Sequence, residues 1–366
     1  MATACNNAQR DDIQDFTKTI YKPEYAIGFE ILGAENREST IIKVLNPWQG
    51  ASGVESELFI SRNGEEAPEG FSGQIIKEKA QRVICLSSSH VGMLDIIGKV
   101  ENVVAVSGMD FISNEYIIAN KDKISDIGYS DNTNHELIVA SKPDLVLMYG
   151  INGINSIEPK LRELGIPFIY IGEYMEEDPI GKVEWIVALA EATGCREKGI
   201  ERFRAIPEEY NAVKKRLENA HGNNPTVMIN TPYGDTWFMA SSQSYIVRLI
   251  RDAGGNYVYE QNTGNMSLPV DMEEAMLLAL KSDCWINVSP IASIPEFLDA
   301  LPKFAEVPCV AKGEIYTNAG KLSPKGGNDF WESGVVNPQI VLRDLVKIFH
   351  PELVEEEFVY YKKLMD

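Results

Sequence analysis

Apolar and polar side chains alternate in the first part of the chain, with the period of a half-buried β-strand. Residues 25–32 and 40–46 carry this alternation on either side of a polar turn, so we predict a β-hairpin there. Residues 57–61 form a further short strand, and the stretch 63–73 is rich in turn residues. We therefore expect an N-terminal β extension over residues 21–80.

The pattern changes at Arg82, from where short, continuously apolar runs alternate with stretches of helical period. Such runs are typical of strands that are buried on both faces. The predicted strands are 83–86, 103–107, 144–149 and 167–171, and the predicted helices are 91–97, 136–141 and 158–164. Strands that alternate with helices form a parallel sheet, so residues 81–178 are expected to be an α/β lobe.

A helical segment follows over residues 179–222. Apolar residues recur at helical spacing over 181–193, where Gly194 stands in the C-cap position, and again over 196–220. Pro207 falls inside the second stretch, which predicts a helix that is kinked there or restarts. The segment lacks the Gly, Ser or Pro content of a flexible linker, so we expect a helical connector.

The alternation of strands and helices resumes over residues 223–366. The predicted strands are 226–230, 284–288 and 314–317, and the predicted helices are 244–253, 271–280, 338–348 and 355–364. Asn337 is the predicted N-cap of the helix that Pro338 opens. The fold class expected is α/β, with two Rossmann-like lobes bridged by a long helix and preceded by a β-hairpin extension.

Composition and charge narrow the choice of partners. The 366 residues include 54 acidic and 34 basic side chains, which gives a formal net charge of -20. Nucleic acid and anionic membrane surfaces are excluded, because binding to either needs clustered Lys and Arg. The apolar runs are shorter than the ~20 residues that a membrane span needs. The length and the 44% hydrophobic content favour a globular protein of two lobes.

The five cysteines are scattered and include no CxxC pair, so neither a zinc site nor a disulfide framework is indicated. Four of them stand in apolar or helix-end surroundings and are expected to be small core residues. These four are Cys85, Cys195, Cys284 and Cys309.

Cys5 differs from the others, because small residues precede it and a polar run follows it. This arrangement resembles the end of a lipoprotein signal, and residues 1–20 would then be a tether. Ala2 stands where such signals usually have Leu, and no hydrophobic stretch precedes it. Either the chain has lost its signal peptide or the match is accidental.

Motifs of common catalytic sites are missing from the sequence. No G-x-G-x-x-G follows a predicted strand, and there is no P-loop, H-E-x-x-H or G-x-S-x-G. The four histidines include no pair at i and i+4, which argues against a histidine metal site. We therefore expect no enzyme and no intrinsic cofactor or metal.

Two carboxylates occupy corresponding places in the two lobes. Glu136 lies in the first turn of a helix behind Asn134, and Glu273 lies in the first turn of another helix behind Asp271. Each helix leads into a predicted strand. Acidic residues at helix N-termini also have an ordinary structural role, which stabilises the helix by about 0.3–1 kcal/mol.

From Arg82 to the C-terminus, the sequence resembles the substrate-binding proteins of ABC importers for siderophores, haem and cobalamin. The segments that carry the resemblance are RVICLSSSHVGML (82–94), ELIVASKPDLV (136–146), DAGG (252–255) and KGEIY (312–316). The branch described as iron-complex binding lipoproteins is the most similar. Its further matches are NPW (46–48), EYME (173–176), EWI (184–186) and NDFWESG (328–334).

The resemblance implies a role for the two carboxylates and for Cys5. In such proteins one Glu on each lobe docks with arginines of the permease, and Glu136 and Glu273 occupy the matching positions. Glu274 is a close competitor for the second role. Exposed carboxylates on two lobes would give a salt-sensitive contact with a basic partner. The resemblance also implies that Cys5 carries a lipid that anchors the protein to a bacterial membrane, in the periplasm.

The resemblance places the ligand between the lobes, where loops follow the strands. Tyr and Trp can stack on a flat, partly apolar chelate or macrocycle, while Lys meets an anionic edge. For each aromatic, core packing is an equally good explanation. The candidate lining residues are Ser88, Ser89, Tyr149, Tyr174, Tyr233, Trp237, Lys325 and Trp331.

The function expected is that of a monomeric substrate-binding component of an ABC importer, which delivers an iron(III) siderophore-type complex to a permease and its ATPase. A bridging helix restricts the relative motion of the lobes, so small closure is expected. A cobalamin (corrinoid) or haem binding protein is the alternative within the class. An α/β enzyme that uses nucleotide sugars, or a receptor domain without transport, would share the fold.

Overall fold

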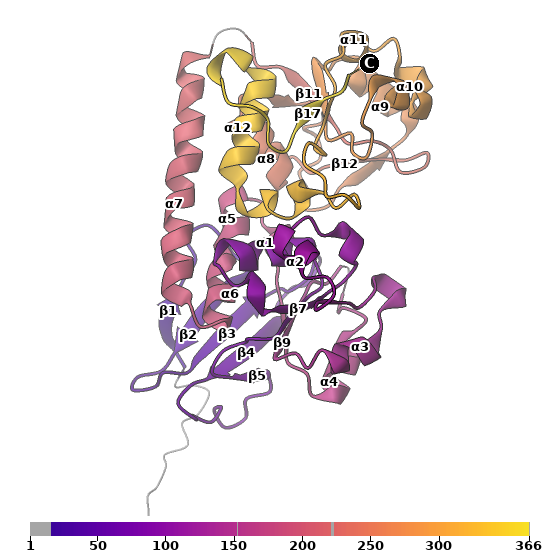
Figure 1. Ribbon diagram of the computed structural model, residues 1–366. Helices are drawn as coiled ribbons and strands as arrows, with labels where there is room; N and C mark the ends of the chain where they lie inside the picture. The colour runs from indigo at the N-terminus through magenta and orange to yellow at the C-terminus, as the bar shows by residue number, and fades with distance from the viewer. Residues whose placement is uncertain (1–15, 152, 221–222, 366) are drawn as a thin grey trace, which may run out of the picture.

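The computed structural model describes residues 16–151, 153–220 and 223–365 (Figure 1). The N-terminal extension is a five-stranded sheet in the order β1-β2-β3-β4-β5. Its strands are β1 Lys18–Tyr21, β2 Phe29–Gly33, β3 Thr40–Leu45, β4 Glu55–Ser61 and β5 Gln74–Lys77. The predicted hairpin is confirmed, because β2 and β3 pair in antiparallel register from Phe29↔Val44 to Gly33↔Thr40.

The first lobe is built on a parallel sheet in the order β10-β9-β6-β7-β8. Its strands are β6 Val83–Cys85, β7 Val103–Val106, β8 Ser125–Asp126, β9 Leu145–Met148 and β10 Phe168–Tyr170. Its helices are α1 Ser88–Ile96, α2 Glu115–Ala119, α3 His135–Ala140 and α4 Glu158–Leu164. Every residue of β9 is buried, as the continuous apolar run predicts. The strand order reverses at β6, and the carboxyl ends of β6, β9 and β10 meet at one edge.

The connector consists of α5 Pro179–Glu184, α6 Ile186–Ala192 and α7 Arg196–Lys215. Helix α7 runs without interruption through Pro207, so the predicted restart there is wrong. Its apolar face is buried, at Phe203, Ile206, Tyr210 and Val213. In Figure 1, α7 lies along one side of the molecule, packed on α6 of the connector and on α12 Pro338–Phe349 of the second lobe. The predicted two-lobed α/β fold with a long helix is confirmed.

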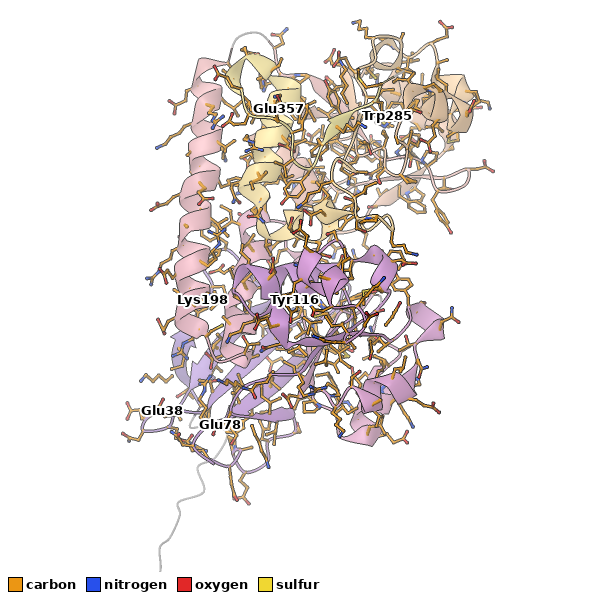
Figure 2. All side chains as sticks on the ribbon, in the orientation of Figure 1. Glu38, Glu78, Tyr116, Lys198, Trp285 and Glu357 are labelled. Carbon is orange, nitrogen blue, oxygen red and sulfur yellow. The ribbon has the colours of Figure 1, made fainter. Side chains whose placement is uncertain are left out.

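The second lobe has a parallel sheet in the order β13-β11-β15. Its strands are β11 Thr226–Ile229, β13 Asn256–Tyr257 and β15 Cys284–Ile286, beside a separate antiparallel pair of β12 Trp237–Met239 and β14 Leu268–Val270. The helices are α8 Tyr245–Asp252, α9 Met272–Ala279, α10 Ile294–Ala300 and α11 Pro308–Ala311. Trp285 of β15 lies in the interior, where it packs on Trp237, Phe297 and Phe304 (Figure 2).

The predicted terminal helix over 355–364 is wrong. The backbone N–H groups of Val359, Tyr360 and Tyr361 all donate to one carboxylate oxygen of Asp344, which holds this segment extended. The chain then forms β17 Lys362–Lys363, which pairs with β16 Tyr316–Thr317. The predicted cap at Asn337 is wrong in one respect, because its side chain donates to the Ser333 carbonyl and does not cap α12.

Three buried carboxylates of the connector region attach the extension to the rest of the protein. Glu184 accepts the backbone N–H groups of Glu24, Tyr25 and Ala26. Glu176 accepts those of Ile27 and Gly28, and Glu191 pairs with Arg62 at 2.6 Å and with Arg196 at 3.0 Å. The extension is therefore a fixed part of the molecule.

The cysteines behave largely as small core residues. Cys85, Cys284 and Cys309 are buried, as predicted, whereas Cys195 is partly exposed. Burial raises the pKa of Cys309 to about 11, so its thiol is protonated at neutral pH. Cys5 lies outside the described residues. Over the part of the chain that the structure describes, no helix has both the length and the apolar character to cross a membrane.

Candidate functional site

The carboxyl ends of β6, β9 and β10 place a polar cluster at the edge of the first lobe that faces the second lobe. Ser87, directly after β6, caps α1 by accepting the N–H of Ser89. The Ser89 hydroxyl donates to Glu173 Oε1 at 2.5 Å, and Glu173 follows β10. Ser89 and Glu173 are buried, so this hydrogen bond joins the first turn of α1 to the segment after β10 in the protein interior.

His90 lies beneath the same edge and is fully buried. Both of its ring nitrogens, and the second carboxylate oxygen of Glu173, lack a hydrogen-bond partner among the described residues. Burial lowers the pKa of His90, so the imidazole is neutral at neutral pH. Tyr149, which follows β9, packs its ring at 6.5 Å from the imidazole. Glu173 was not predicted to be part of the site, although it belongs to the EYME segment (173–176).

A cavity of about 400 Å³ opens between the extension and the two lobes. The extension contributes its 45–51 loop, the first lobe contributes the loop after β10, and the second lobe contributes the start of α8 and Asn265. Gln49 links all three parts, because its side-chain amide donates to the Asn265 carbonyl at 3.0 Å and its backbone N–H donates to the Tyr174 hydroxyl at 3.3 Å. The participation of the extension was not predicted.

The predicted lining residues divide into several groups. Tyr174 lines the cavity, and its hydroxyl donates to the Gly150 carbonyl. Ser88 contacts the second lobe, since its hydroxyl donates to the Trp331 carbonyl at 3.4 Å. The side chains of Trp331 and Tyr233 are 47% and 85% exposed, and Lys325 is also exposed.

The prediction that Trp237 lines the ligand site is wrong. Its side chain is 0% exposed, its indole N–H donates to the Ile229 carbonyl, and its ring packs on Trp285 and Phe304. Trp237 is thus a core residue of the second lobe and does not line the cleft in this structure. Ser89, although it lies at the predicted edge, is buried beneath the surface and bonded to Glu173.

The two lobes touch directly through the NDFWESG segment. The Ser113 N–H donates to Glu332 Oε2 at 2.9 Å, and the Ser113 hydroxyl donates to Asp329 at 2.8 Å. Gly92 of α1 packs against the Glu332 carbonyl so closely that a Cβ on Gly92 would lie 2.4 Å from it. Burial raises the pKa of Glu332 to about 7.

The two helix-start carboxylates have equivalent local geometry. Asn134 accepts the N–H groups of Glu136 and Leu137, and Asp271 accepts those of Glu273 and Glu274. Glu136 and Glu273 are each the second residue after the cap, and both are exposed, whereas Glu274 is partly buried. In Figure 1, α3 and α9 both lie on the side of the molecule away from α7.

Within the described residues, no group of three or more His, Cys, Asp or Glu side chains is arranged to hold a metal ion. The polar atoms at the cleft are mainly hydroxyls and amides. Hydroxyls and amides offer hydrogen bonds to a ligand, and the aromatic rings offer stacking.

Comparisons with known proteins agree with this geometry. A family model described as periplasmic binding protein matches residues 83–321, which leaves the β extension outside it. An uncharacterized lipoprotein of Methanocaldococcus jannaschii is 26% identical over 296 residues, which cover 77% of this chain and 68% of that protein. A second uncharacterized lipoprotein of this organism is 24% identical over 335 residues, or 86% of this chain and 81% of that protein.

Solved structures share the fold at low sequence identity. A periplasmic haem-binding protein from Pseudomonas aeruginosa superposes with a TM-score of 0.61 and 14% identity, over 77% of this chain and 97% of that chain. A protein of an Fe³⁺-hydroxamate transport system from Saccharomonospora viridis superposes with a TM-score of 0.57 and 18% identity, over 81% of this chain and 96% of that chain. The periplasmic vitamin B12 binding protein of Vibrio cholerae superposes with a TM-score of 0.53 and 13% identity, over 76% of this chain and 99% of that chain.

Proposed function

The chain belongs to the periplasmic binding protein family, and from this premise we propose that it captures an iron(III) siderophore-type complex between its lobes for an ABC permease. The resemblance inferred from the sequence is confirmed, since the family match covers most of the chain from Val83 onward. Binding proteins of this class bring a small molecule to a membrane partner. No residue of the chain is assigned a catalytic role.

The observation that carries the proposal is the cavity of about 400 Å³ between the extension and the two lobes, on the side of the first lobe where the loop after β10 lies. In open α/β sheets, ligands bind outside the carboxyl ends of the strands, and the loop after β10 leaves the sheet at such an end. Aromatic side chains of both lobes, Tyr174 and Tyr245, line the cavity together with Trp48. These rings suit a large, partly apolar complex, and an iron(III) ion inside its own chelator needs no protein ligand.

Contacts between the lobes support a mechanism of small opening and closing. Helix α7 spans both lobes, and Arg248 of the second lobe pairs with Asp178 of the connector at 3.2 Å. The Ser113–Glu332 hydrogen bond ties the lobes on another side. Release would require these contacts to break, and we propose that the permease pulls the lobes apart while its ATPase subunits hydrolyse ATP.

Docking and anchoring complete the proposal. Glu136 and Glu273 would face arginines of the permease, one from each lobe, because both are exposed at equivalent positions of capped helices. A lipid on Cys5 would hold a monomeric protein at the outer face of the cytoplasmic membrane, in the periplasm. The two relatives that are named lipoproteins support this anchoring.

Native mass spectrometry and visible absorption titration test the proposed ligand. The protein is incubated separately with a ferric siderophore, with haemin and with cyanocobalamin. We expect a one-to-one complex with the ferric siderophore, with tighter binding than for the two macrocycles. Tight binding of cyanocobalamin or haemin alone would show that this macrocycle, and not an iron(III) siderophore, is the ligand. Turnover of a sugar nucleotide would overturn the transport role.

A further inference from the structure

The N-terminal extension reaches the ligand-facing edge of the first lobe. The backbone of Trp48 forms a parallel β-bridge with Gly150, which follows β9. The Trp48 ring packs edge-on against Tyr170 of β10, with 5.5 Å between ring centroids. Loop 46–51 therefore lies against the carboxyl ends of β9 and β10.

The same loop contacts the second lobe. Gln49 donates its side-chain amide hydrogen to the Asn265 carbonyl at 3.0 Å, while its backbone N–H donates to the Tyr174 hydroxyl. The cavity thus has three walls, and the extension supplies the wall that the periplasmic binding protein match, residues 83–321, does not include.

The cavity wall carries no basic side chain. Of the described residues that line it, none is Lys, Arg or His, and two are glutamates. Glu176 is buried and already accepts N–H groups from Ile27, Gly28 and the Trp185 indole, whereas Glu177 is exposed. Lys182 contacts the Tyr245 ring at 4.5 Å from its centroid but is not among the lining residues.

The remaining polar groups of the wall are uncharged. They are the amides of Asn46, Gln49 and Asn265 and the hydroxyls of Ser241, Ser244, Tyr174 and Tyr245. The Ser244 hydroxyl oxygen is buried and lacks a hydrogen-bond partner in the structure. Amides and hydroxyls can both donate and accept, so they match a ligand rich in neutral carbonyl and N–H groups.

We propose that loop 46–51 is the third wall of the ligand site, and that the site as a whole selects uncharged or cationic chelates bearing hydroxamate or amide groups over anionic chelates, with Glu177 of the first-lobe wall as the charged residue. The inference rests on the proposed function and narrows its ligand. An anionic chelate would place its charge beside Glu177 with no cation on the cavity wall to compensate, so the two negative charges would repel each other. A neutral or cationic chelate meets no such penalty.

Isothermal titration calorimetry with three ferric complexes tests the selection. The probes are ferrichrome, a neutral tris-hydroxamate, ferrioxamine B, a cationic tris-hydroxamate, and ferric enterobactin, an anionic tris-catecholate. We expect the full chain to bind both hydroxamate complexes at least about 10-fold more tightly than the catecholate complex, which corresponds to about 1.4 kcal/mol. Tightest binding of the catecholate complex would overturn the proposal.

Two substitutions test the site: Glu177→Lys tests the selection by charge, and Gln49→Ala tests the wall formed by loop 46–51. Glu177→Lys should weaken ferrioxamine B binding and strengthen ferric enterobactin binding, each by about 10-fold. Gln49→Ala should weaken the preferred complex by about 5-fold or more through the lost bridge to Asn265. The matched controls, Glu101→Lys and Gln81→Ala, change exposed residues outside the cavity and should leave all affinities unchanged.

The outcomes separate this inference from the function on which it rests. If the unmodified protein binds none of the three complexes, the proposed function fails. If it binds them but Gln49→Ala behaves like its control, the third wall is refuted, and if Glu177→Lys behaves like its control, the charge selection is refuted, while the function stands in both cases. Both substitutions alter side chains at the protein surface, so folding of the variants is expected and can be checked by circular dichroism.

Discussion

Glu184 of α5 accepts the backbone N–H of Tyr25 at 2.8 Å, although the two residues belong to different parts of the chain. The same carboxylate accepts the N–H groups of Glu24 and Ala26 at 2.8 Å and the Tyr21 hydroxyl at 2.7 Å. Glu184 is 0% exposed, so its charge is balanced by these four donors. A single buried side chain thus fixes the entry of the extension onto the connector.

Replacing this carboxylate should loosen the extension. Glu184→Ala leaves three backbone N–H groups without their acceptor, so we expect the free energy of unfolding to fall by about 3 kcal/mol or more. Urea unfolding monitored by tryptophan fluorescence measures the change, and limited proteolysis should show earlier cleavage in residues 16–30. Glu177→Gln changes an exposed glutamate and is the control, and its free energy of unfolding should stay within about 0.5 kcal/mol of that of the parent. A loss below about 1 kcal/mol for Glu184→Ala would contradict this role.

The paired docking carboxylates give a prediction about transport. The double variant Glu136→Ala, Glu273→Ala should abolish ligand uptake in reconstituted proteoliposomes while it leaves ligand affinity unchanged, because both side chains are exposed and remote from the cavity lining. Each single variant should weaken uptake in a manner that depends on salt concentration.

Two controls sharpen the docking prediction. Glu197→Ala changes a side chain on α7 that is 86% exposed and should transport normally. Glu274→Ala should have a smaller effect than Glu273→Ala, because Glu274 is partly buried and one position further along α9. Normal uptake by the double variant would refute the assignment of both residues.

Glu332 makes stability depend on pH. Burial, the largest cause, and nearby Asp329 raise its pKa from 4.5 to about 7, against the opposing effect of hydrogen bonds from Ser113 and Asn114. The folded state therefore keeps a proton that the unfolded chain has lost, so this stabilisation is complete below about pH 4.5 and disappears as pH rises through 7. The change amounts to at most about 3 kcal/mol.

The substitution Glu332→Gln should remove that dependence. A neutral amide can still accept the Ser113 N–H, so the variant should be more stable than the parent at pH 8 by about 1–3 kcal/mol and close to it at pH 5. Urea unfolding at the two pH values measures both differences. Glu101→Gln, at an exposed position, is the control and should show the same dependence of the free energy of unfolding on pH as the parent. The prediction is contradicted if Glu332→Gln shows that same dependence.

Local patterns predicted the local elements well. The alternation in 40–46 places Ile42 and Val44 in the core as part of β3, and the caps at Asn134 and Asp271 start α3 and α9 as expected. These features depend on neighbouring residues only, so the sequence contains the information directly.

Long-range partners explain what could not be predicted. Glu176 and Glu184 look like ordinary helix-end acids until the fold brings residues 24–28 against them. The segment 355–364 has helical spacing, but Asp344 takes its N–H groups and keeps it extended. In the sequence, Trp237 lies in the segment after the predicted strand 226–230, where a ligand-binding residue would be expected. Only its packing against Trp285 in the structure assigns it to the core.

Pro207 provides the last prediction, because it lies inside an unbroken α7 next to the fully buried Ile206. Proline lacks the N–H that would donate to the Phe203 carbonyl, and its ring crowds the preceding turn. Pro207→Ala should restore this hydrogen bond and raise the free energy of unfolding by about 1–2 kcal/mol, less than the full helix penalty because proline also restricts the unfolded chain. Thermal and urea unfolding measure the gain, with Glu208→Ala as the exposed control on the same helix. A destabilised Pro207→Ala variant would instead mean that the packing of α7 on the two lobes requires the local backbone geometry that proline sets.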